Sequence, residues 1–342
     1  MNEHLFPYKW YLKDGYPSKG ITKNNLNVFG TFICGGGSTM GYKLAGYNHV
    51  GGVEIDKVVS KVYKLNHNPK YLFNEDIREF NKRQDLPKEL YSLDLLDGSP
   101  PCSTFSIAGS REKAWGKSKQ FREGQAMQTL DDLVFVYCDT IIKLQPKVFI
   151  LENVKGIIQG NAKVYSKNIV KKMTEAGYEV QVFCLNAASM GVPQKRERVF
   201  FIGSKKELKF KKLRLEFNEK PIPFKEIDSK ISKIEITEMA LALWNKCEKG
   251  KSFSTVHKKK SWFNRTRIND NEVLPTITTH VKSDIYHSNF PRHLNEIEIS
   301  IAATYPLDYD YNKLPYSFLI GMSVPPVMTA QIANQIYLQW FK

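Results

Sequence analysis

A cysteine stands where an apolar strand ends in a rigid turn. Leu95 and Leu96 lead through Asp97 and Gly98 into the run 99–101, which is Ser-Pro-Pro, and Cys102 follows. A thiol held at such a turn is placed for nucleophilic attack, although most free cysteines are small core side chains. Cys102 is therefore a candidate nucleophile whose role depends on the residues that accompany it in the chain.

A glycine turn and two acids predict a nucleoside pocket in the first third of the chain. Gly35, Gly36 and Gly37 follow a strand and precede a helix, so the backbone there can approach a ligand closely. Glu54 ends the next strand, where an acid commonly accepts hydrogen bonds from ribose hydroxyls. Asp76 ends the third strand and could accept from an adenine amino group. Such a set serves nicotinamide, flavin or S-adenosylmethionine equally well.

The elements that must position these residues alternate along the chain. Apolar patterns predict strands at 27–33, 49–55, 71–73, 93–96, 148–151, 179–184 and 199–202, and helices at 39–45, 57–65, 129–144, 170–176 and 324–337. This alternation predicts a doubly wound α/β sheet of the Rossmann-like kind, with ligands at the carboxyl ends of its strands.

The charge of the chain favours an anionic partner. Its 342 residues carry a net charge of +15, and a Lys and Arg excess of this size is typical of proteins that bind nucleic acid, although solvated surface charges would give the same count. Residues 201–270 hold 18 Lys and Arg against 9 Asp and Glu, with aromatic residues between them. This change of character predicts a second, smaller basic domain.

The number and spacing of the cysteines indicate the compartment and argue against a metal site. The five cysteines, at 34, 102, 138, 184 and 247, form no CxxC pair and no zinc-like grouping with the seven histidines. We therefore expect reduced thiols in a cytoplasmic protein, with neither a disulfide scaffold nor a metal site. No apolar run approaches the roughly 18 residues of a membrane span, so no membrane contact is expected.

Four further segments, taken in order with the glycine turn, resemble the motifs of the DNA (cytosine carbon-5) methyltransferases. These segments are 99–102 (SPPC), 151–154 (LENV), 192–198 (VPQKRER) and 320–326 (IGMSVPP). The resemblance runs from about residue 28 to 336 and thins in the basic region after Gly203. It implies a catalytic, S-adenosylmethionine-binding domain over 1–203, completed by 286–342, and a target recognition domain over 204–285.

The resemblance implies a covalent reaction. Cys102 would attack carbon 6 of cytosine, so that carbon 5 can take the methyl group of S-adenosylmethionine. Glu152 would contact ring nitrogen 3 and handle the charge there. Arg196 and Arg198 would bind the base carbonyl or hold the catalytic loop and Glu152, and Gln194 would shape the site. Read alone, Glu152 could equally be a simple partner of an arginine.

The resemblance also implies the cofactor contacts, and two positions depart from the family pattern. The expected contacts are Phe32, Gly35, Gly36, Gly37, Glu54, Ile55, Asp76, Ile77 and Ser323. Cys34 replaces the first glycine of the turn, and Met322 with Ser323 stands where the pattern has asparagine after Gly321. Because neither change touches the nucleophile or its acid partner, we expect an active enzyme.

Double-stranded DNA is the expected partner. A base inside a duplex is unreachable, so the target cytosine must be flipped into the pocket, and the Ser-, Gly- and Lys-rich run 103–124 suits a loop that closes over it. The candidate DNA contacts are Arg111, Lys113, Lys258, Lys259, Lys260, Arg265, Arg267 and Thr278. We expect DNA affinity to fall steeply with salt, and the protein to act as a monomer.

The expected function is a modification methylase of a restriction-modification system or a phage. An RNA (tRNA) cytosine-5 methyltransferase on the same scaffold is the nearest alternative, because the basic region does not exclude it. A silent DNA-binding or cofactor-sensing protein is a second alternative, which a Cys102→Ala substitution would test. A nicotinamide dehydrogenase has no use for the Pro-Pro-Cys turn.

Overall fold

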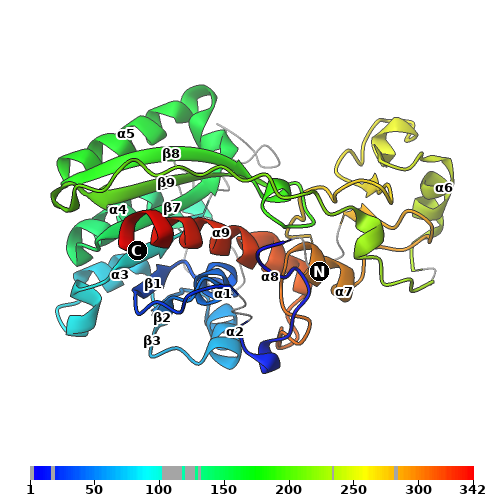
Figure 1. Ribbon diagram of the computed structural model, residues 1–342. Coiled ribbons are helices and arrows are strands. Elements are labelled where there is room, and N and C mark those ends of the chain that lie inside the picture. Colours follow the sequence, from blue (N-terminus) through cyan, green and yellow to red (C-terminus); the bar gives the residue numbers. More distant parts are fainter. Residues whose placement is uncertain are drawn as a thin grey trace.

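The protein consists of a large lobe built on one sheet and a small lobe beside it (Figure 1). The computed structural model describes residues 4–16, 20–101, 132–232, 235–280 and 284–342, and the backbone of 118–119 and 128–129. Among these residues, no helix has the length and apolar character that crossing a membrane requires.

The large lobe contains a seven-stranded sheet of order β3-β2-β1-β4-β7-β9-β8. Its strands are β1 Asn27–Thr31, β2 Asn48–Val53, β3 Tyr71–Phe73, β4 Leu95–Gly98, β7 Val148–Val154, β8 Tyr178–Asn186 and β9 Glu197–Lys205. The first five in the sheet are parallel, and β9 runs antiparallel to both β7 and β8. The predicted α/β fold is confirmed, with an antiparallel strand that the sequence pattern did not distinguish.

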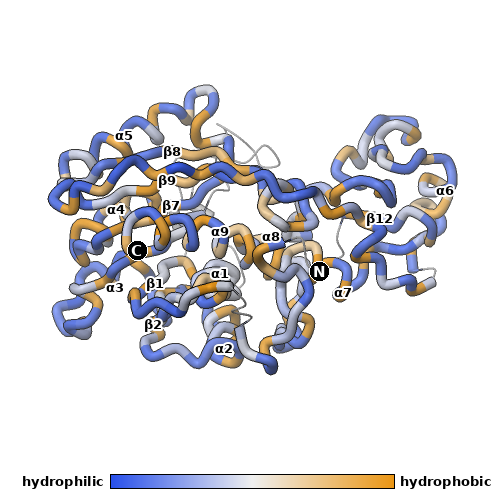
Figure 2. Tube along the Cα trace, in the orientation of Figure 1, coloured by the Kyte–Doolittle hydropathy of each residue, from blue (hydrophilic) through white to orange (hydrophobic). Residues whose placement is uncertain are grey.

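Helices cover both faces of this sheet. They are α1 Gly37–Leu44, α2 Lys57–His67, α3 Ile77–Lys82, α4 Leu133–Leu144, α5 Lys163–Glu175 and α9 Pro326–Ile336. Successive residues of a strand enter different cores: Val28 packs with α1, α2 and α9, and Phe29 packs with α3, α4 and α5. Hydrophobic and hydrophilic residues accordingly alternate along the helices that cover the sheet (Figure 2).

Two helices differ from their predicted limits by more than two residues. Helix α5 begins at Lys163, well before the predicted 170, because its first two turns bury few side chains and carry little apolar signal. Helix α4 begins at Leu133, and the predicted start at 129 falls instead in the short strand β6, Gln128–Thr129, which pairs with β5, Ser118–Lys119.

The small lobe, residues 236–286, has its own apolar centre. It contains α6 Glu238–Lys246, β10 Lys251–Ser252, β11 Thr266–Arg267 and β12 Ile285–Tyr286. Trp244, Phe253 and Tyr286 pack together there. Leu213 and Phe224 belong to the core of the large lobe, so the first part of the predicted recognition domain 204–285 lies against the sheet domain. The exact division of domains stays a prediction.

Two further helices lead the chain back to the large lobe. They are α7 Glu296–Ala302 and α8 Tyr316–Met322. Ile299 and Leu319 pack into the large-lobe core, and α8 ends directly before the buried helix α9. The C-terminal segment therefore packs on the sheet domain.

Candidate active site

The carboxyl ends of the parallel strands meet at one edge of the sheet. The glycine turn follows β1, Glu54 follows β2, Asp76 follows β3, the Pro100 turn follows β4, and Glu152 lies near the end of β7. Because the sheet order is β3-β2-β1-β4-β7, these segments are neighbours in space. Open α/β sheets bind their ligands at this edge, so the predicted site residues gather where the fold requires.

The turn between β1 and α1 has an unusual backbone. Phe32, Cys34 and Gly36 have φ values of 54°, 48° and 76°, all in the left-handed region. Non-glycine residues adopt this conformation at an energetic cost, and such residues cluster at functional sites. At Gly36 a Cβ atom would lie 2.2 Å from Nε2 of His67, so no larger residue fits.

Two side chains that the sequence analysis did not identify hold this turn. Nε2 of His67 lies 3.2 Å from the carbonyl oxygen of Gly35, and the hydroxyl of Tyr309 donates to the same oxygen at 2.5 Å. Because a carbonyl only accepts, His67 carries its proton on Nε2. Burial lowers the pKa of His67 to about 3, so the ring is neutral at physiological pH. These two residues are far apart in the sequence and belong to no motif, so their contact with the turn could not be predicted.

Glu54 faces the turn as an acceptor. One carboxylate oxygen accepts from the N–H of Cys34 at 3.0 Å, and the other accepts from the N–H of Asp56 at 2.9 Å. Burial raises the pKa of Glu54 to about 7, against the opposing effect of these hydrogen bonds. A carboxylate has about four acceptor positions, so capacity remains for hydroxyl groups such as those of ribose.

Asp76 and Ile77 lie at the start of α3. Oδ1 of Asp76 accepts from the N–H of Arg78 at 2.8 Å, and the Arg78 guanidinium lies 3.3 Å from Oδ2. Ile77 packs with Leu133 and Phe32 in a small apolar cluster. The structure thus brings two predicted cofactor contacts, Phe32 and Ile77, together. Asp76 caps its helix, and its contact with adenine stays a prediction.

The C-terminal segment reaches the other side of the turn. Oγ of Ser323 lies 3.7 Å from Sγ of Cys34 and donates to the carbonyl of Leu319 at 2.9 Å. A Cβ atom on Gly37 would lie 2.2 Å from the carbonyl oxygen of Val324. Ser323 therefore borders the glycine turn, and Cys34, which stands where the family has glycine, contacts it directly.

Asp97, at the end of β4, is a buried acid that the sequence analysis left without a role. It accepts from the hydroxyl of Tyr42 at 2.9 Å. Burial raises the pKa of Asp97 to about 6, and hydrogen bonds from Ser38 and Tyr42 act in the opposite direction. This contact joins α1, which begins in the glycine turn, to the strand that leads to Cys102. An acid inside an apolar run is visible in the sequence and could have been identified.

Glu152 forms an ion pair at the end of β7. Its Oε1 lies 3.0 Å from Nε of Arg198 in β9, and both side chains are largely buried. The adjacent Asn153 donates through Nδ2 to the carbonyl of Pro100 at 3.3 Å. This hydrogen bond joins Glu152's strand to the turn before Cys102, which itself lies outside the described residues. The pair fits both readings of the sequence, an arginine that holds a functional acid and a simple ion pair.

Arg196 and Gln194 connect three segments behind this edge. The Arg196 guanidinium donates to the carbonyls of Ile277, at 3.4 Å, and Gly321, at 3.2 Å. The Gln194 side chain accepts from the N–H of Ile277 at 3.0 Å and donates to the carbonyl of Ala302 at 3.4 Å. Both residues therefore hold the chain around Ile277 to the large lobe, and contact with a base stays a prediction.

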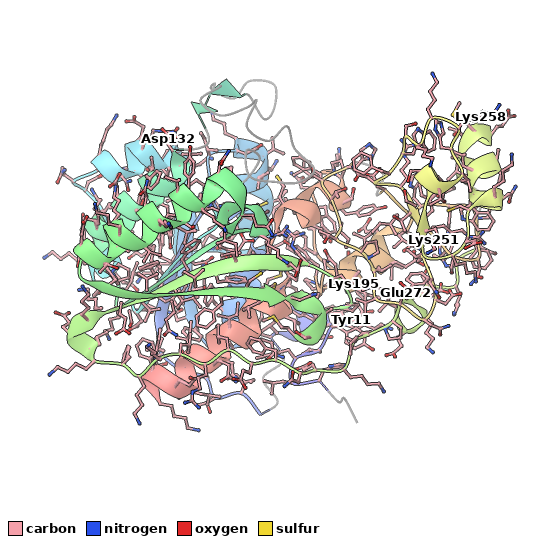
Figure 3. The ribbon with its side chains drawn as sticks, turned by 90° about the horizontal axis from the view of Figure 1, so that it is seen from above. Tyr11, Asp132, Lys195, Lys251, Lys258 and Glu272 are labelled. Atoms are coloured by element: carbon pink, nitrogen blue, oxygen red, sulfur yellow. The ribbon has the colours of Figure 1, made fainter. Side chains whose placement is uncertain are left out.

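The predicted DNA contacts lie in separate places. Lys258, Lys259 and Lys260 are exposed, and Lys258 projects from the far end of the small lobe (Figure 3). The Arg265 guanidinium lies 3.7 Å from the ring centre of Trp262. Near the large lobe, Oγ1 of Thr278 lies 3.4 Å from Oδ2 of Asp284. Two of the predicted contacts, Arg111 and Lys113, lie outside the described residues.

Arg267 is used within the small lobe. Its guanidinium group donates to the carbonyls of Trp244 at 3.1 Å, Cys247 at 2.9 Å and Ser288 at 2.8 Å. It also lies 3.8 Å from the ring centre of Trp244. These contacts occupy the group inside the lobe and favour a structural role over the predicted contact with DNA.

Comparison with known proteins identifies the family. The model of the C-5 cytosine-specific DNA methylase family matches residues 26–338. Type II methyltransferase M.FnuDI of Fusobacterium nucleatum is 33% identical over 218 residues, which cover 63% of this chain and 56% of that protein. Orphan methyltransferase M.SPRI of Bacillus phage SPR is 35% identical over 179 residues, which cover 52% of this chain and 37% of that protein. The chain thus spans about half the length, or less, of these curated relatives.

Solved structures share the fold. A crystal structure described as a DNA modification methyltransferase encoded within an E. coli prophage superposes with a TM-score of 0.72 at 20% identity, covering 93% of this chain and 100% of that one. A mutant of DNMT2 from Spodoptera frugiperda gives a TM-score of 0.64 at 16% identity, covering 92% and 100%. The resemblance found in the sequence motifs is confirmed: the chain belongs to the C-5 cytosine-specific DNA methylase family.

Proposed function

We propose that this protein transfers a methyl group from S-adenosylmethionine to carbon 5 of a cytosine in a specific duplex DNA sequence. One observation carries the proposal. The Asn153 amide joins the Glu152–Arg198 pair to the Pro100 turn that leads to Cys102, beside the glycine turn in the same sheet edge. A nucleophile, an acid partner and a nucleoside pocket are what this reaction needs together.

The pocket residues fit the donor. Glu54 keeps acceptor capacity for ribose hydroxyls, and Phe32 and Ile77 offer an apolar surface for a purine ring. Gly36 and Gly37 are fixed as glycines by packing within the protein, because a Cβ atom on either would collide with His67 or with the carbonyl of Val324. S-adenosylmethionine supplies an electrophilic methyl group when it is bound there.

The chain's own residues account for the other steps. The Cys102 sulfur forms a bond to carbon 6 of the flipped base, and a proton that Glu152 shares with ring nitrogen 3 offsets the negative charge that this attack places on the ring. Carbon 5 then takes the methyl group, and S-adenosylhomocysteine is the leaving group. Loss of the carbon-5 proton to a base, for which water suffices, breaks the bond to sulfur and restores both the ring and Cys102. Arg198 keeps Glu152 oriented through its ion pair.

The biological role follows from the same reasoning. Matched relatives include Type II methyltransferases and orphan phage methyltransferases, which supports a modification methylase of a restriction-modification system or a phage. The monomeric state and the cytoplasmic location expected from the sequence stay predictions. RNA as the substrate is the alternative, because the exposed lysines of the small lobe suit any nucleic acid backbone.

The test is methyl transfer by the purified protein from radiolabelled S-adenosylmethionine to duplex DNA and, separately, to total tRNA. We expect label on DNA only, and a covalent complex on DNA that contains 5-fluorocytosine. Cys102→Ala should abolish both signals, whereas Glu152→Gln should slow transfer by about 100-fold or more, the usual size of an acid–base contribution. Label on tRNA alone would establish the RNA alternative, and transfer by Cys102→Ala would refute the mechanism.

A further inference from the structure

Two of the segments that connect the lobes lie side by side. The incoming segment is 228–232, continued by Glu235, and the outgoing segment is 287–295. The N–H of Glu235 donates to the carbonyl of Pro291 at 3.2 Å, and Nε of Arg292 donates to the carbonyl of Ile231 at 2.8 Å. The chain around Ile277 also holds the small lobe, through Arg196 and Gln194, so the contacts made by these two segments are one part of what fixes its orientation.

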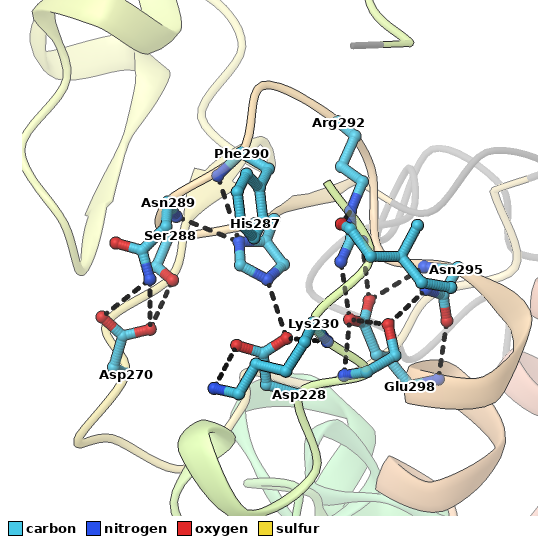
Figure 4. Close-up of polar contacts among 12 residues, drawn as sticks. Asp228, Lys230, Asp270, His287, Ser288, Asn289, Phe290, Arg292, Asn295 and Glu298 are labelled. Carbon is cyan, nitrogen blue, oxygen red and sulfur yellow. Dashed lines mark hydrogen bonds and ion pairs between the residues drawn. The ribbon is translucent and has the colours of Figure 1, made fainter. Parts of the chain in front are cut away.

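A buried ion pair ties the outgoing segment to the large lobe (Figure 4). The Arg292 guanidinium donates to both oxygens of Glu298, at 2.8 and 2.7 Å, and the side chains are 2% and 0% exposed. Glu298 lies in α7, whose apolar residue Ile299 belongs to the large-lobe core. A two-bond contact of this kind fixes direction as well as distance.

The same carboxylate holds the incoming segment. Oε1 of Glu298 accepts from the N–H of Ser229 at 3.2 Å and from its hydroxyl at 2.8 Å. Nδ2 of Asn295 donates to the Ser229 hydroxyl at 2.8 Å, and Asn295 also caps the start of α7. Both segments therefore converge on one helix end of the large lobe.

A second contact joins the two segments directly. Nδ1 of His287 accepts from the N–H groups of Asn289, at 3.0 Å, and Phe290, at 3.2 Å, so Nε2 carries the proton and donates to Asp228 at 3.1 Å. Burial lowers the pKa of His287, which keeps the ring neutral and the donor in place. Lys230 lies 3.0 Å from the other Asp228 oxygen. We call these contacts of the two segments with α7 the junction network.

The junction network is not a metal site, although the ligand atoms of Asp228, His287 and Glu298 lie within 4.8 Å of one another. Both oxygens of Glu298 are bound by the Arg292 guanidinium, which stays charged at every accessible pH. A fixed positive charge in the middle of the cluster opposes a cation.

Stability alone does not account for the network. Taking two charges out of water is costly, and a buried ion pair is often no more stabilising than an apolar pair of the same volume. A fully hydrogen-bonded network also favours a single geometry, because few arrangements of its side chains satisfy every buried donor and acceptor. The junction network has this property at the place where the orientation of the small lobe is set.

We propose that Arg292 and Glu298 are positioning residues, which hold the small lobe at the angle that presents a bound duplex to the sheet edge with Glu152 and the glycine turn. This inference rests on the proposed function, since the orientation matters only if the small lobe binds the substrate. The pair touches neither the base nor the methyl donor. The ion pair affects the fraction of duplexes bound by the small lobe that also reach the sheet edge with Glu152.

The test replaces the pair by apolar residues of similar volume, in the double variant Arg292→Met with Glu298→Leu. We expect a melting temperature close to that of the unmodified protein and an unchanged Kd for S-adenosylhomocysteine. The KM for target duplex should rise about tenfold with kcat unchanged, and discrimination against duplexes lacking the target should fall. An unchanged KM and unchanged discrimination in a folded double variant would overturn the proposal.

A milder pair of variants covers the case in which the double variant does not fold. Ser229→Ala removes one hydroxyl from the junction network, and Ser300→Ala removes a comparable hydroxyl from α7, where it contacts Tyr311 at 2.9 Å. We expect a raised KM for duplex from Ser229→Ala alone. Equal KM values in the two variants would count against a positioning role.

Small-angle scattering of the DNA-free protein separates this inference from the proposed function. A broader distribution of interatomic distances is expected for the double variant than for the unmodified protein, whatever the substrate. If the unmodified protein methylates no DNA, the proposed function fails by itself. If the scattering curves of the two proteins coincide, the network does not hold the lobe, and the inference fails by itself.

Discussion

At the residue scale, Glu54 is a buried acid whose protonation the fold changes near neutral pH. Burial raises its pKa from 4.5 to about 7. The folded protein therefore holds this proton more tightly than the unfolded chain does. The contribution of Glu54 to stability is complete below about pH 4.5 and is lost as the pH rises through about 7. A ligand whose hydroxyl groups donate hydrogen bonds to Glu54 favours the ionised carboxylate instead.

We therefore predict that S-adenosylhomocysteine binds more tightly as the pH rises. With a pKa near 7, the ionised fraction of Glu54 grows about tenfold between pH 6 and pH 8, and the association constant should grow by a similar factor. Isothermal titration calorimetry at several pH values measures this. Asp97, whose pKa is raised to about 6, also titrates nearby, so a variant is needed to isolate Glu54.

Glu54→Gln is that variant. It should bind S-adenosylhomocysteine more weakly than the unmodified protein at pH 8 and lose most of the pH dependence. An unmodified protein with equal affinity at pH 6 and pH 8 would show that the Glu54 carboxylate does not accept from the ligand. A pH dependence retained in Glu54→Gln would assign the titration to another group, with Asp97 the first to examine.

The position of a residue in the fold was predictable where it follows from strand order, and was not predictable where distant contacts determine it. Glu54 and Asp76 were found because acids that end successive parallel strands must lie at one edge. His67 and Tyr309 were missed because only the folded chain brings them to Gly35. The left-handed backbone conformation of Cys34 could not be predicted either, because non-glycine residues rarely adopt it and the sequence carries no signal for it.

At the element scale, the glycine turn depends on support from outside its own strand and helix. Tyr309, in the chain between α7 and α8, donates through its hydroxyl to the carbonyl of Gly35. Predicted strands matched well because buried parallel strands are short apolar runs. The small lobe was predicted as a region but not in its elements, because its strands are two residues long and carry no periodicity.

We predict that Tyr309→Phe weakens cofactor binding. Loss of one buried hydrogen bond should cost about 0.5–1.5 kcal/mol, which corresponds to a rise of roughly two- to twelvefold in the Kd for S-adenosylhomocysteine if the turn alone is affected. Tyr311→Phe is the matched control, because its buried hydroxyl contacts Ser300 at 2.9 Å instead of the turn. Denaturant unfolding should show similar losses of stability in both variants. Equal Kd values in the two would contradict a role for Tyr309 in holding the turn.

At the scale of the whole molecule, the positive charge is the property most directly tied to a large anionic partner. The net charge of +15 acts on any polyanion, but only charges placed near the duplex release counterions from it. The exposed lysines at the far end of the small lobe lie beyond the junction network, on the lobe that we infer is held toward the substrate. Those on α5 lie on the outer face of the large lobe (Figure 1). Substituting three lysines in the small lobe or three on α5 removes the same charge from different places, so an experiment can separate the effect of position from that of net charge.

We predict that replacing Lys258, Lys259 and Lys260 by Ala weakens binding to duplex DNA of any sequence and flattens its salt dependence. If all three meet phosphates, the slope of log K against log salt concentration should fall in magnitude by about 2 to 3. The control variant replaces Lys163, Lys167 and Lys171 on α5, which changes the net charge equally and should leave the slope nearly unchanged. Fluorescence anisotropy over a salt series measures both. Equal slopes in the two variants would mean that the net charge of the protein attracts the duplex. The proposal that the small lobe binds DNA would then be contradicted.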